Sequence, residues 1–354
     1  MIIVVNTGST STKMAAFNGT ELYFSGTVRH SKEELDKFEK VVLQKDFRMN
    51  DINTWILENG IKNSDIECVI AIGGLLKKME SGAFEVNQDM IDDLTEAKYG
   101  QHAANLSAII AKEIADNAGV KAYIADPITV DEMQEIARMS GHPNFRRSGR
   151  CHTLNQKRIA RLASEELGKA YDEVNLVVAH LGGGISIVAH EKGKMIDTSS
   201  NRGEGAFSID RSGAINSWEL ANLCFSGKYE KDEVLSMLNG SGGIIAYLNL
   251  TDFKTVENQK NAGDKLSGEV FNALIYQVTK EIGSLSAVLS GNVDAIVLTG
   301  GMSYSKELVR IVKERVGFIS NILVYPGENE MLALAEYADG ILKDTIKVKE
   351  YIKV

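Results

Sequence analysis

Two separate parts of the chain repeat one pattern of strands and glycine-rich turns. Residues 2–28 read IIVVNTGSTSTKMAAFNGTELYFSGTV, and residues 175–201 read NLVVAHLGGGISIVAHEKGKMIDTSSN. Each reads as a strand, a Gly/Ser bend, a second strand, a short glycine turn and a third strand. Asn6 precedes Gly19 by 13 residues (19 − 6), and His180 precedes Gly193 by the same interval (193 − 180). The bend and the next turn are therefore equally spaced in both parts.

The repeat continues downstream of both hairpins. Residues 65–76 (DIECVIAIGGLL) and 292–303 (NVDAIVLTGGMS) each predict a buried apolar strand that ends in Gly-Gly. Each part also has a stretch with apolar residues at helical spacing and a terminal glycine, 102–119 and 269–291. A repeat of a whole unit is more specific than any single motif. It predicts an α/β fold of two similar domains packed face to face, with an interdomain cleft.

The two Gly/Ser bends are candidate phosphate-binding turns. Backbone N–H groups and hydroxyls in a tight bend can surround phosphate oxygens. A Gly/Ser-rich hairpin is more often a plain turn, and NTGSTSTK lacks the GxxxxGK[ST] pattern of a Walker loop. The phosphate interpretation depends on the pair, because two such bends facing one cleft would grip a nucleotide phosphate chain from both sides.

Composition excludes several other classes of protein. The chain has 354 residues, enough for two domains, and its net charge of −9 disfavours a nucleic-acid partner. Its three cysteines are widely spaced, which matches neither a disulfide framework nor a zinc site and predicts a reducing cytoplasm. The first apolar run, MIIVV, is too short for a signal peptide. No apolar run approaches the roughly 18–20 residues of a membrane span, so no membrane partner is expected.

Six motifs in order resemble the acetate kinase family and, within it, the butyrate kinases. They are VVNTGSTSTK, VVAHLGGGIS, GEGAFSIDRSG, CFSGKY, VLTGGMSYS and VYPGENEMLALAE, and the resemblance runs from residue 1 to about residue 342. It implies the actin-like ATPase (ribonuclease H-like) fold, and an enzyme that phosphorylates a short-chain carboxylic acid reversibly with ATP and Mg²⁺ to give an acyl phosphate. It also implies a homodimer or higher homo-oligomer. We expect one lobe at 1–152 plus 328–354 and a nucleotide-side lobe at 153–327.

Phosphoryl transfer to a carboxylate brings several negative charges together. The site therefore needs metal, cations and hydrogen-bond donors, but hardly a base, because the acid is already ionised at pH 7. Arg211, in IDRSG, lies in a Gly/Ser-flanked loop where its planar fork can clamp a carboxylate or phosphate. The resemblance makes Arg211 the substrate-site arginine and His180 a transition-state stabiliser that donates to the phosphoryl group.

Two acids are candidate metal ligands. Asp126 ends the apolar run AYIAD, where a carboxylate at the end of a strand can anchor Mg²⁺, although a turn or cap role is the alternative. Asp131 and Glu132 follow closely and are alternatives to it. Glu330 opens an amphipathic stretch and resembles the family's second acid near the metal, but a glutamate there also favours the helix dipole.

The remaining predicted site residues bind the nucleotide. Those expected at the β- and γ-phosphates are Asn6, Ser9, Ser11, Lys13, Gly182, Gly183 and Gly184. Those expected at the nucleoside are Asp252, Lys254, Gly300 and Gly301, although an arginine is more usual in the family than Lys254.

One departure from the family concerns the substrate carboxylate. The family usually has an arginine before the first Gly-Gly, and this chain has Ile72 there. Arg150 is a candidate replacement for the lost cation. The chain could therefore be a catalytically weak or inactive nucleotide-binding paralogue. A sugar or polyol kinase of the same fold is a third alternative, which would need a general base such as Asp126.

Overall fold

The computed structural model describes residues 1–200 and 203–353, which form two compact units. Met1–Asp131 and Asn329–Val354 make the first unit, and Glu132–Glu328 makes the second. The units divide after Asp131, earlier than the predicted junction after residue 152. The intervening segment belongs to the second unit because it bonds to a strand there: the Gln134 N–H donates to the Ile196 carbonyl at 3.0 Å.

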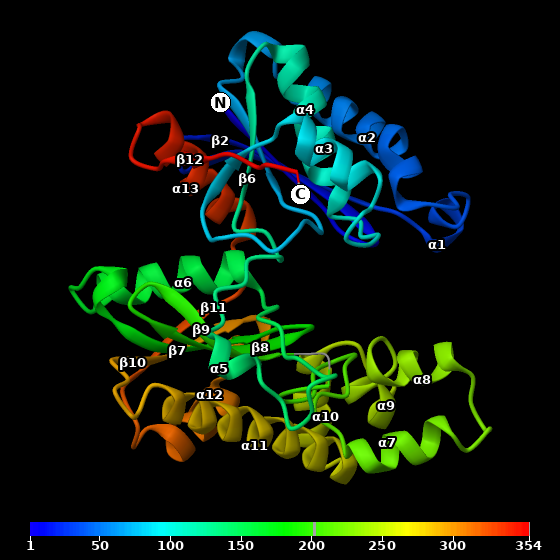
Figure 1. Ribbon diagram of the computed structural model, residues 1–354, viewed down its shortest axis with the longest axis vertical. Helices are drawn as coiled ribbons and strands as arrows, with labels where there is room; N and C mark the ends of the chain where they lie inside the picture. The colour runs from blue at the N-terminus through cyan, green and yellow to red at the C-terminus, as the bar shows by residue number, and fades with distance from the viewer. Residues whose placement is uncertain (201–202, 354) are drawn as a thin grey trace. The chain divides into compact units, whose positions relative to one another are not determined.

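The first unit is built on a seven-stranded sheet in the order β12-β5-β6-β4-β1-β2-β3. Figure 1 shows α2, α3 and α4 on one face of this sheet and α13 on the other. Its strands are β1 (Ile2–Thr7), β2 (Ser11–Asn18), β3 (Glu21–Arg29), β4 (Cys68–Ile72), β5 (Ala83–Glu85), β6 (Lys121–Ala125) and β12 (Val348–Lys349). Its helices are α1 (Lys32–Leu35), α2 (Lys45–Glu58), α3 (Gln88–Thr95), α4 (Asn105–Ala118) and α13 (Glu330–Leu342), with 3₁₀ turns at Val41–Gln44 and Asn63–Asp65.

The second unit has a five-stranded sheet in the order β11-β10-β7-β8-β9. Its strands are β7 (Asn175–Leu181), β8 (Ile185–Glu191), β9 (Lys194–Ser200), β10 (Ala295–Gly300) and β11 (Ile322–Pro326). Its helices are α5 (Glu135–Arg138), α6 (Thr153–Glu166), α7 (Ser217–Cys224), α8 (Lys231–Leu238), α9 (Gly243–Leu248), α10 (Phe253–Asn261), α11 (Lys265–Val288) and α12 (Lys306–Val316), with 3₁₀ turns at Tyr171–Glu173 and Gly301–Tyr304.

The two sheets share one topology, which confirms the duplicated α/β unit. In each, three antiparallel strands are followed by two parallel ones: β3-β2-β1-β4-β6 in the first unit matches β9-β8-β7-β10-β11 in the second. The matched turn glycines have positive φ, 59° at Gly19 and 83° at Gly193, a conformation that suits glycine. The predicted helical stretches are α4 and α11, and Gly119 ends α4 in the left-handed region.

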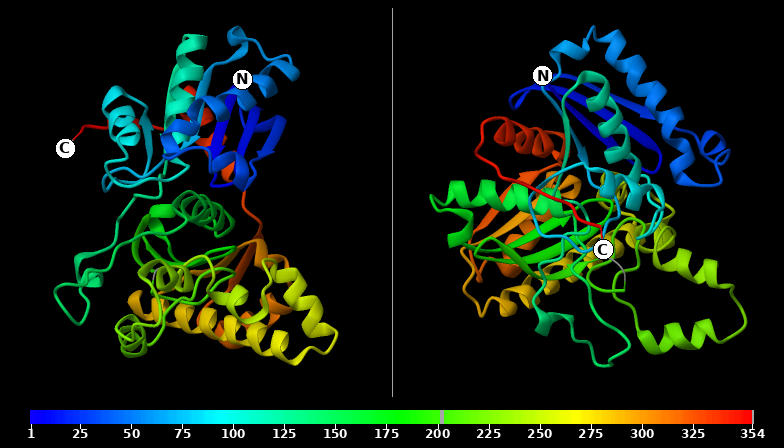
Figure 2. Two further views of the ribbon diagram at one scale, coloured as in Figure 1. Left: turned by 90° about the vertical axis from the view of Figure 1, so that its right-hand side faces the viewer. Right: turned by 45° about the horizontal axis from the view of Figure 1, so that its top comes forward.

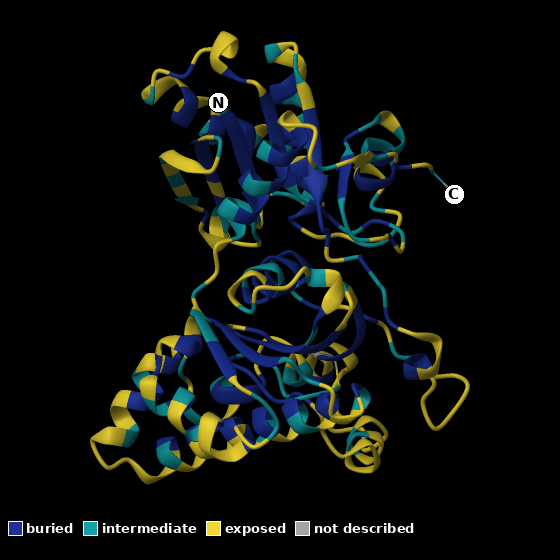
Figure 3. Ribbon diagram, turned by 90° about the vertical axis from the view of Figure 1, so that its left-hand side faces the viewer, coloured by how far each residue is buried: buried dark blue, intermediate teal, exposed yellow. Residues whose placement is uncertain are grey.

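Each unit buries its own apolar core around these strands. In the first unit α4 packs against β1 and β4 while α2 packs against β2 and α4, and in the second unit α11 packs against β7 and β8. Figure 3 shows the central strands buried and the outer helical surfaces exposed. Among the described residues, we find no helix that is both apolar enough and long enough to span a lipid bilayer.

One segment of the second unit stands apart from this core. Helices α7 and α8 run out from the sheet (Figure 2), and no residue of α7 is buried. Trp218 and Phe225 are 75% and 91% exposed. Large exposed aromatic side chains grouped on one segment are typical of a surface that another protein covers.

A buried histidine makes the stability of the second unit depend on pH. His190, in β8, is fully buried, with Nδ1 2.7 Å from the Tyr171 hydroxyl and Nε2 3.1 Å from Gln156 Oε1. Burial, and then the charge of Lys157, hold the pKa of His190 well below its usual value. The folded protein thus keeps His190 neutral, whereas the unfolded chain binds a proton below about pH 6.5.

We expect this histidine to reduce stability on acidification. Because the unfolded state alone takes up the proton, the free energy of unfolding should fall by about 1.4 kcal/mol per pH unit below pH 6 on account of His190. Urea unfolding at pH 7.5 and 5.5 measures this change, which should shrink in His190→Gln. His142→Gln alters an exposed histidine and should leave the change as it is. Equal pH dependence in both variants would contradict the assignment.

Candidate functional site

The centre of the second unit is the glycine turn between β7 and β8. His180 lies at the end of β7, next to this turn of Gly182, Gly183 and Gly184, and its side chain is buried. A Cβ atom on Gly184 would collide with the guanidinium of Arg211, so this arginine lies directly against the turn. The structure therefore brings together five residues that the sequence predicted separately.

The loop that carries Arg211 is fixed by backbone hydrogen bonds. The Ser208 N–H donates to the Arg211 carbonyl at 2.9 Å, and the Ile209 N–H donates to the Gly183 carbonyl at 3.3 Å. The Arg211 side chain is 25% exposed, and its Nε lies 3.7 Å from Asp210 Oδ1. A half-buried guanidinium held this way can bind a carboxylate or phosphate that reaches the turn.

The sequence reasoning missed three polar neighbours of His180. His152 stacks on its ring with 4.1 Å between ring centroids, Asn155 Oδ1 lies 2.9 Å from Nδ1, and Glu328 Oε1 lies 3.0 Å from Nε2. Because an amide oxygen only accepts, Nδ1 of His180 donates to Asn155. The pKa of His152 is lowered by burial and then by His180 and Arg211, so His152 adds no further charge here.

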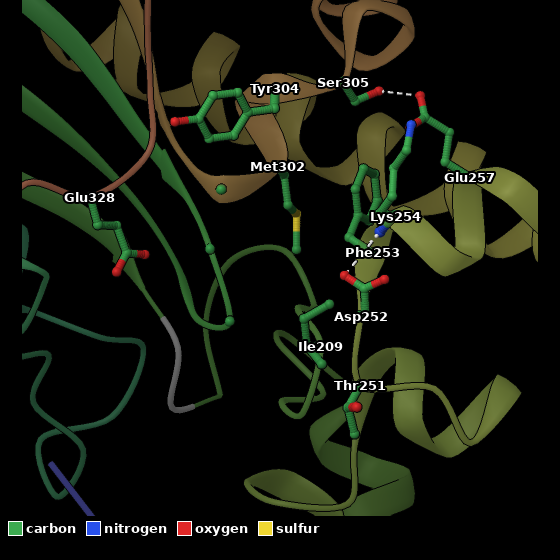
Figure 4. A pocket seen from close by; sticks show the side chains of 13 residues that line it. Ile209, Thr251, Asp252, Phe253, Lys254, Glu257, Met302, Tyr304, Ser305 and Glu328 are labelled. Carbon is green, nitrogen blue, oxygen red and sulfur yellow. Dashed lines mark hydrogen bonds and ion pairs between the residues drawn. The ribbon is translucent and has the colours of Figure 1, made fainter. Parts of the chain in front are cut away.

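A cavity of about 620 Å³ adjoins the turn in the same unit. Figure 4 shows Asp252 and Lys254 on one side of it and Glu328 on the opposite side. Its lining residues are Gly182, Gly183, Ile209, Thr251, Asp252, Phe253, Lys254, Glu257, Gly301, Met302, Tyr304, Ser305 and Glu328. A cavity of this size is within the range of small-molecule sites.

The predicted nucleoside residues differ in their roles around this cavity. Asp252 caps α10, accepting from the Thr255 N–H at 2.8 Å and from the Thr255 hydroxyl at 2.7 Å, and this hydroxyl bond is the main cause that lowers its pKa. Lys254 Nζ pairs with Glu257 at 3.1 Å. Gly301 lines the cavity, whereas Gly300 does not: at φ 86° it packs against the Leu181 backbone, which leaves no room for a Cβ atom.

In the first unit, the bend after β1 is held from behind by Arg48, which the sequence reasoning also missed. This fully buried side chain of α2 donates from Nη1 to the carbonyls of Gly8 and Ser11, both at 3.0 Å, and from Nη2 to the Ser9 carbonyl at 3.3 Å. The C=O and the following N–H of a trans peptide point in opposite directions. The N–H groups of Ser9 and Thr10 therefore face away from Arg48, as a phosphate-binding turn requires.

The polar side chains of this bend are arranged on either side of it. Ser9 is exposed, Ser11 is half-buried at the start of β2, and Lys13 is exposed on β2 opposite Asn6. Asn6 Nδ2 donates to Glu330 Oε2 at 2.9 Å. The structure thus joins one predicted phosphate-binding residue to one predicted metal-site acid.

Asp126 has a strained backbone and a carboxylate that accepts three hydrogen bonds. Its φ is 40°, uncommon for a residue with a side chain. Its Oδ1 accepts from the Ser81 hydroxyl at 2.6 Å and from the Gly82 N–H at 2.9 Å, and Oδ2 accepts from the Tyr337 hydroxyl. The alternative acid Glu132 is bound to the buried Lys157 at 2.6 Å, which indicates a structural role.

These contacts limit how a metal could bind. Among the described residues, no three His, Cys, Asp or Glu side chains are grouped to hold a metal ion. Mg²⁺ in phosphoryl-transfer sites keeps several waters and uses only one or two carboxylates plus substrate phosphates. Two carboxylates, such as the predicted Asp126 and Glu330, would be enough for a Mg²⁺ of this kind.

Comparisons with known proteins find matches over most of the chain. The sequence model of the acetokinase family matches residues 138–330. Butyrate kinase 1 of Clostridium acetobutylicum is 44% identical over 351 residues, 99% of each chain. The acetate kinase of Porphyromonas gingivalis has a TM-score of 0.78 at 18% identity, covering 95% of this chain and 98% of its own. A propionate kinase of Francisella tularensis subsp. tularensis SCHU S4 has a TM-score of 0.73 at 20% identity, covering 95% and 98%. The structural matches confirm the predicted actin-like fold.

Proposed function

We propose that this chain, a short-chain carboxylate kinase of the acetokinase family, transfers the γ-phosphoryl group of ATP to an acid. The acid is butyrate or a branched short-chain acid. One observation carries the proposal: Arg211, His180 and the glycine turn meet beside a cavity of about 620 Å³. The relative at 44% identity is a butyrate kinase, which supports butyrate as the acid.

The proposed reaction is a single displacement at phosphorus. A carboxylate oxygen of the acid attacks the γ-phosphorus, and the bond from that phosphorus to the β-phosphate oxygen breaks. ADP leaves with the electron pair and the acyl phosphate forms, and we propose that the step runs readily in both directions. Arg211 would orient the acid and offset its charge, while His180 would donate to an oxygen of the moving group.

The other predicted residues would hold the nucleotide. The outward N–H groups at Ser9 and Thr10 and those of the glycine turn would bind phosphates, and Asp252 would bind the nucleoside. Mg²⁺ bound with the nucleotide would neutralise part of the phosphate charge. Asp126 and Glu330 would orient its water ligands, with Tyr337 and Asn6 holding the two carboxylates in place.

A hydroxylamine trap tests the proposed activity directly. Incubation of the protein with Mg-ATP, hydroxylamine and a panel of C2–C6 acids should give a hydroxamate, with the highest yield from butyrate or a branched acid. The same assay with acyl phosphate and ADP should produce ATP. No hydroxamate from any acid would contradict the carboxylate kinase, and activity on sugars or polyols alone would favour the third alternative.

The residue at position 72 gives a test of substrate binding. Ile72 ends β4 and pairs with Ala125 on β6, directly before Asp126. We expect Ile72→Arg to raise kcat/KM about tenfold or more, through a lower KM for the acid, because it adds a charge-assisted contact worth about 1.5–3 kcal/mol. Ile72→Met is the neutral control of similar size.

Two outcomes bear on the predicted alternatives. An unchanged KM for the acid in Ile72→Arg would show that this strand end does not contact the carboxylate. Activity that appears only in this variant would instead favour the weak or inactive paralogue. Arg150 lies on an exposed loop of the second unit, and its role as a replacement cation stays a prediction that Arg150→Ala would test.

We also propose that the protein is a homodimer or higher homo-oligomer, with the exposed aromatic residues of the α7–α8 segment in the interface. Phe225→Glu should shift the sedimentation coefficient to that of a monomer, because it places a charge where apolar surface is covered. Leu57→Glu changes a leucine of the first unit that is 77% exposed and should leave the assembly intact. A monomeric protein before substitution would contradict the proposal.

The cysteine pattern still predicts a cytoplasmic location.

A further inference from the structure

Glu328 has a position that the proposed reaction does not explain. It is the last residue of the second unit, and its carboxylate lies over the glycine turn: a Cβ atom on Gly182 would be 2.6 Å from Glu328 Oε1 and 2.9 Å from His180 Nε2. The same oxygen is 3.0 Å from His180 Nε2. A negative group therefore lies where a phosphate oxygen would reach both the turn and the histidine.

The surroundings of this carboxylate are those of an anion site. Asn155 occupies the other nitrogen of His180, so Nε2 is the nitrogen that faces a ligand. Arg211 lies against Gly184 on the same turn. Glu328 also lines the cavity that holds Asp252 and Lys254 (Figure 4).

The carboxylate is not needed to support the core. Its side chain is 42% exposed, and it ends a loop after β11 rather than packing in an apolar cluster. It pairs with the buried His180 directly at the glycine turn, so its position bears on any ligand that reaches this turn.

We propose that Glu328 takes the phosphate position of the proposed nucleotide site until a nucleotide binds, and thereby makes the site select metal-complexed nucleotide over free nucleotide. This inference rests on the proposed function, because it requires that the glycine turn bind phosphates. Free ADP or ATP brings negative charge to Glu328, and the two anions repel each other. A divalent cation on the phosphates reduces this repulsion, so the complexed nucleotide displaces the carboxylate at lower cost.

Calorimetric titration of the full chain with ADP, in EDTA and in Mg²⁺, tests the inference. Glu328→Gln keeps the size of the side chain and removes its charge. We expect this variant to bind Mg²⁺-free ADP about tenfold more tightly than the original chain, so that Mg²⁺ strengthens binding less. Glu328→Asp keeps the charge and should keep the preference for Mg-ADP, and Glu314→Gln, on the exposed face of α12, is the matched control.

The possible results separate this inference from the proposed function. Equal or weaker binding of Mg²⁺-free ADP to Glu328→Gln would overturn the inference, because removal of the carboxylate charge would then not have relieved any repulsion. If the original chain bound neither ADP nor Mg-ADP, the proposed function would fail, and this inference with it. If the original chain binds Mg-ADP but Glu328→Gln binds Mg²⁺-free ADP no more tightly than the original chain does, the inference alone is overturned.

Discussion

Replacing Arg211 with alanine is expected to lower kcat/KM for acyl phosphate formation at least about 100-fold while the fold survives. The guanidinium lies against Gly184, close to His180 and His152. A charge-assisted contact made at the reacting groups is worth about 2.7 kcal/mol when it changes the rate by this factor. The fold should survive because the Ser208–Arg211 bond that fixes the loop uses backbone atoms only.

Steady-state kinetics with the preferred acid and Mg-ATP would measure this effect. Arg211→Lys keeps a charge without the planar fork and should recover only part of the loss. Arg310→Ala removes an exposed arginine of α12 that pairs with Glu314, and it should leave the rate unchanged. A near-normal rate in Arg211→Ala, with circular dichroism showing a folded protein, would mean that the substrate-site arginine is misassigned.

Local sequence patterns were enough to predict the duplicated fold. Apolar residues alternate along the strands, and Gly19 follows Asn6 at the same interval as Gly193 follows His180. These patterns predicted three antiparallel strands in each half, and both sheets have them. These signals succeed because a strand and its hairpin turn are set by neighbouring residues. The boundary between the units was less accessible, since residues 132–152 join the second unit through bonds to a strand about 60 residues later.

The candidate site was predicted in part, because its pieces meet only through tertiary contacts. His152 contacts His180 across 28 residues, and Glu328 contacts it across 148 (180 − 152 and 328 − 180). No spacing rule relates residues so far apart, so the sequence alone did not predict these contacts. For Asp126, sequence gave the strand end but not the three donors around its carboxylate.

Arg48 is different, because its sequence does contain a usable signal. Arg48 shares the buried face of α2 with Ile52, Trp55 and Ile56, at the i+4, i+7 and i+8 spacing of a core-facing helix. A charge at a core position is rarely left without acceptors. The arginine therefore predicts a nearby cluster of acceptors, and the carbonyls of the bend after β1 belong to that cluster.

The second large effect should follow from Arg48→Met, which replaces the guanidinium with an apolar side chain of similar length. The carbonyls of Gly8, Ser9 and Ser11 would then lose a donor. An unsatisfied buried acceptor costs about 1–3 kcal/mol, so we expect the free energy of unfolding to fall by about 3–5 kcal/mol, less than the simple sum because the bend can relax toward water. Urea unfolding followed by circular dichroism measures this loss.

The part of the first unit that is destabilised in Arg48→Met shows whether Arg48 fixes the bend after β1 or supports the core in general. If Arg48 organises the bend, amide hydrogen exchange in Arg48→Met should speed up at residues 8–12 more than in the distant strand β6, and the KM for ATP should rise about tenfold or more because the outward N–H groups lose their orientation. Arg48→Lys keeps the charge with fewer directed donors, so its exchange rate and its KM for ATP should lie between those of the original chain and Arg48→Met. Arg29→Met, on the exposed edge of β3, should change neither the exchange rate at residues 8–12 nor the KM for ATP. A uniform increase in exchange across the first unit, with an unchanged KM for ATP, would show that Arg48 supports the core rather than the turn.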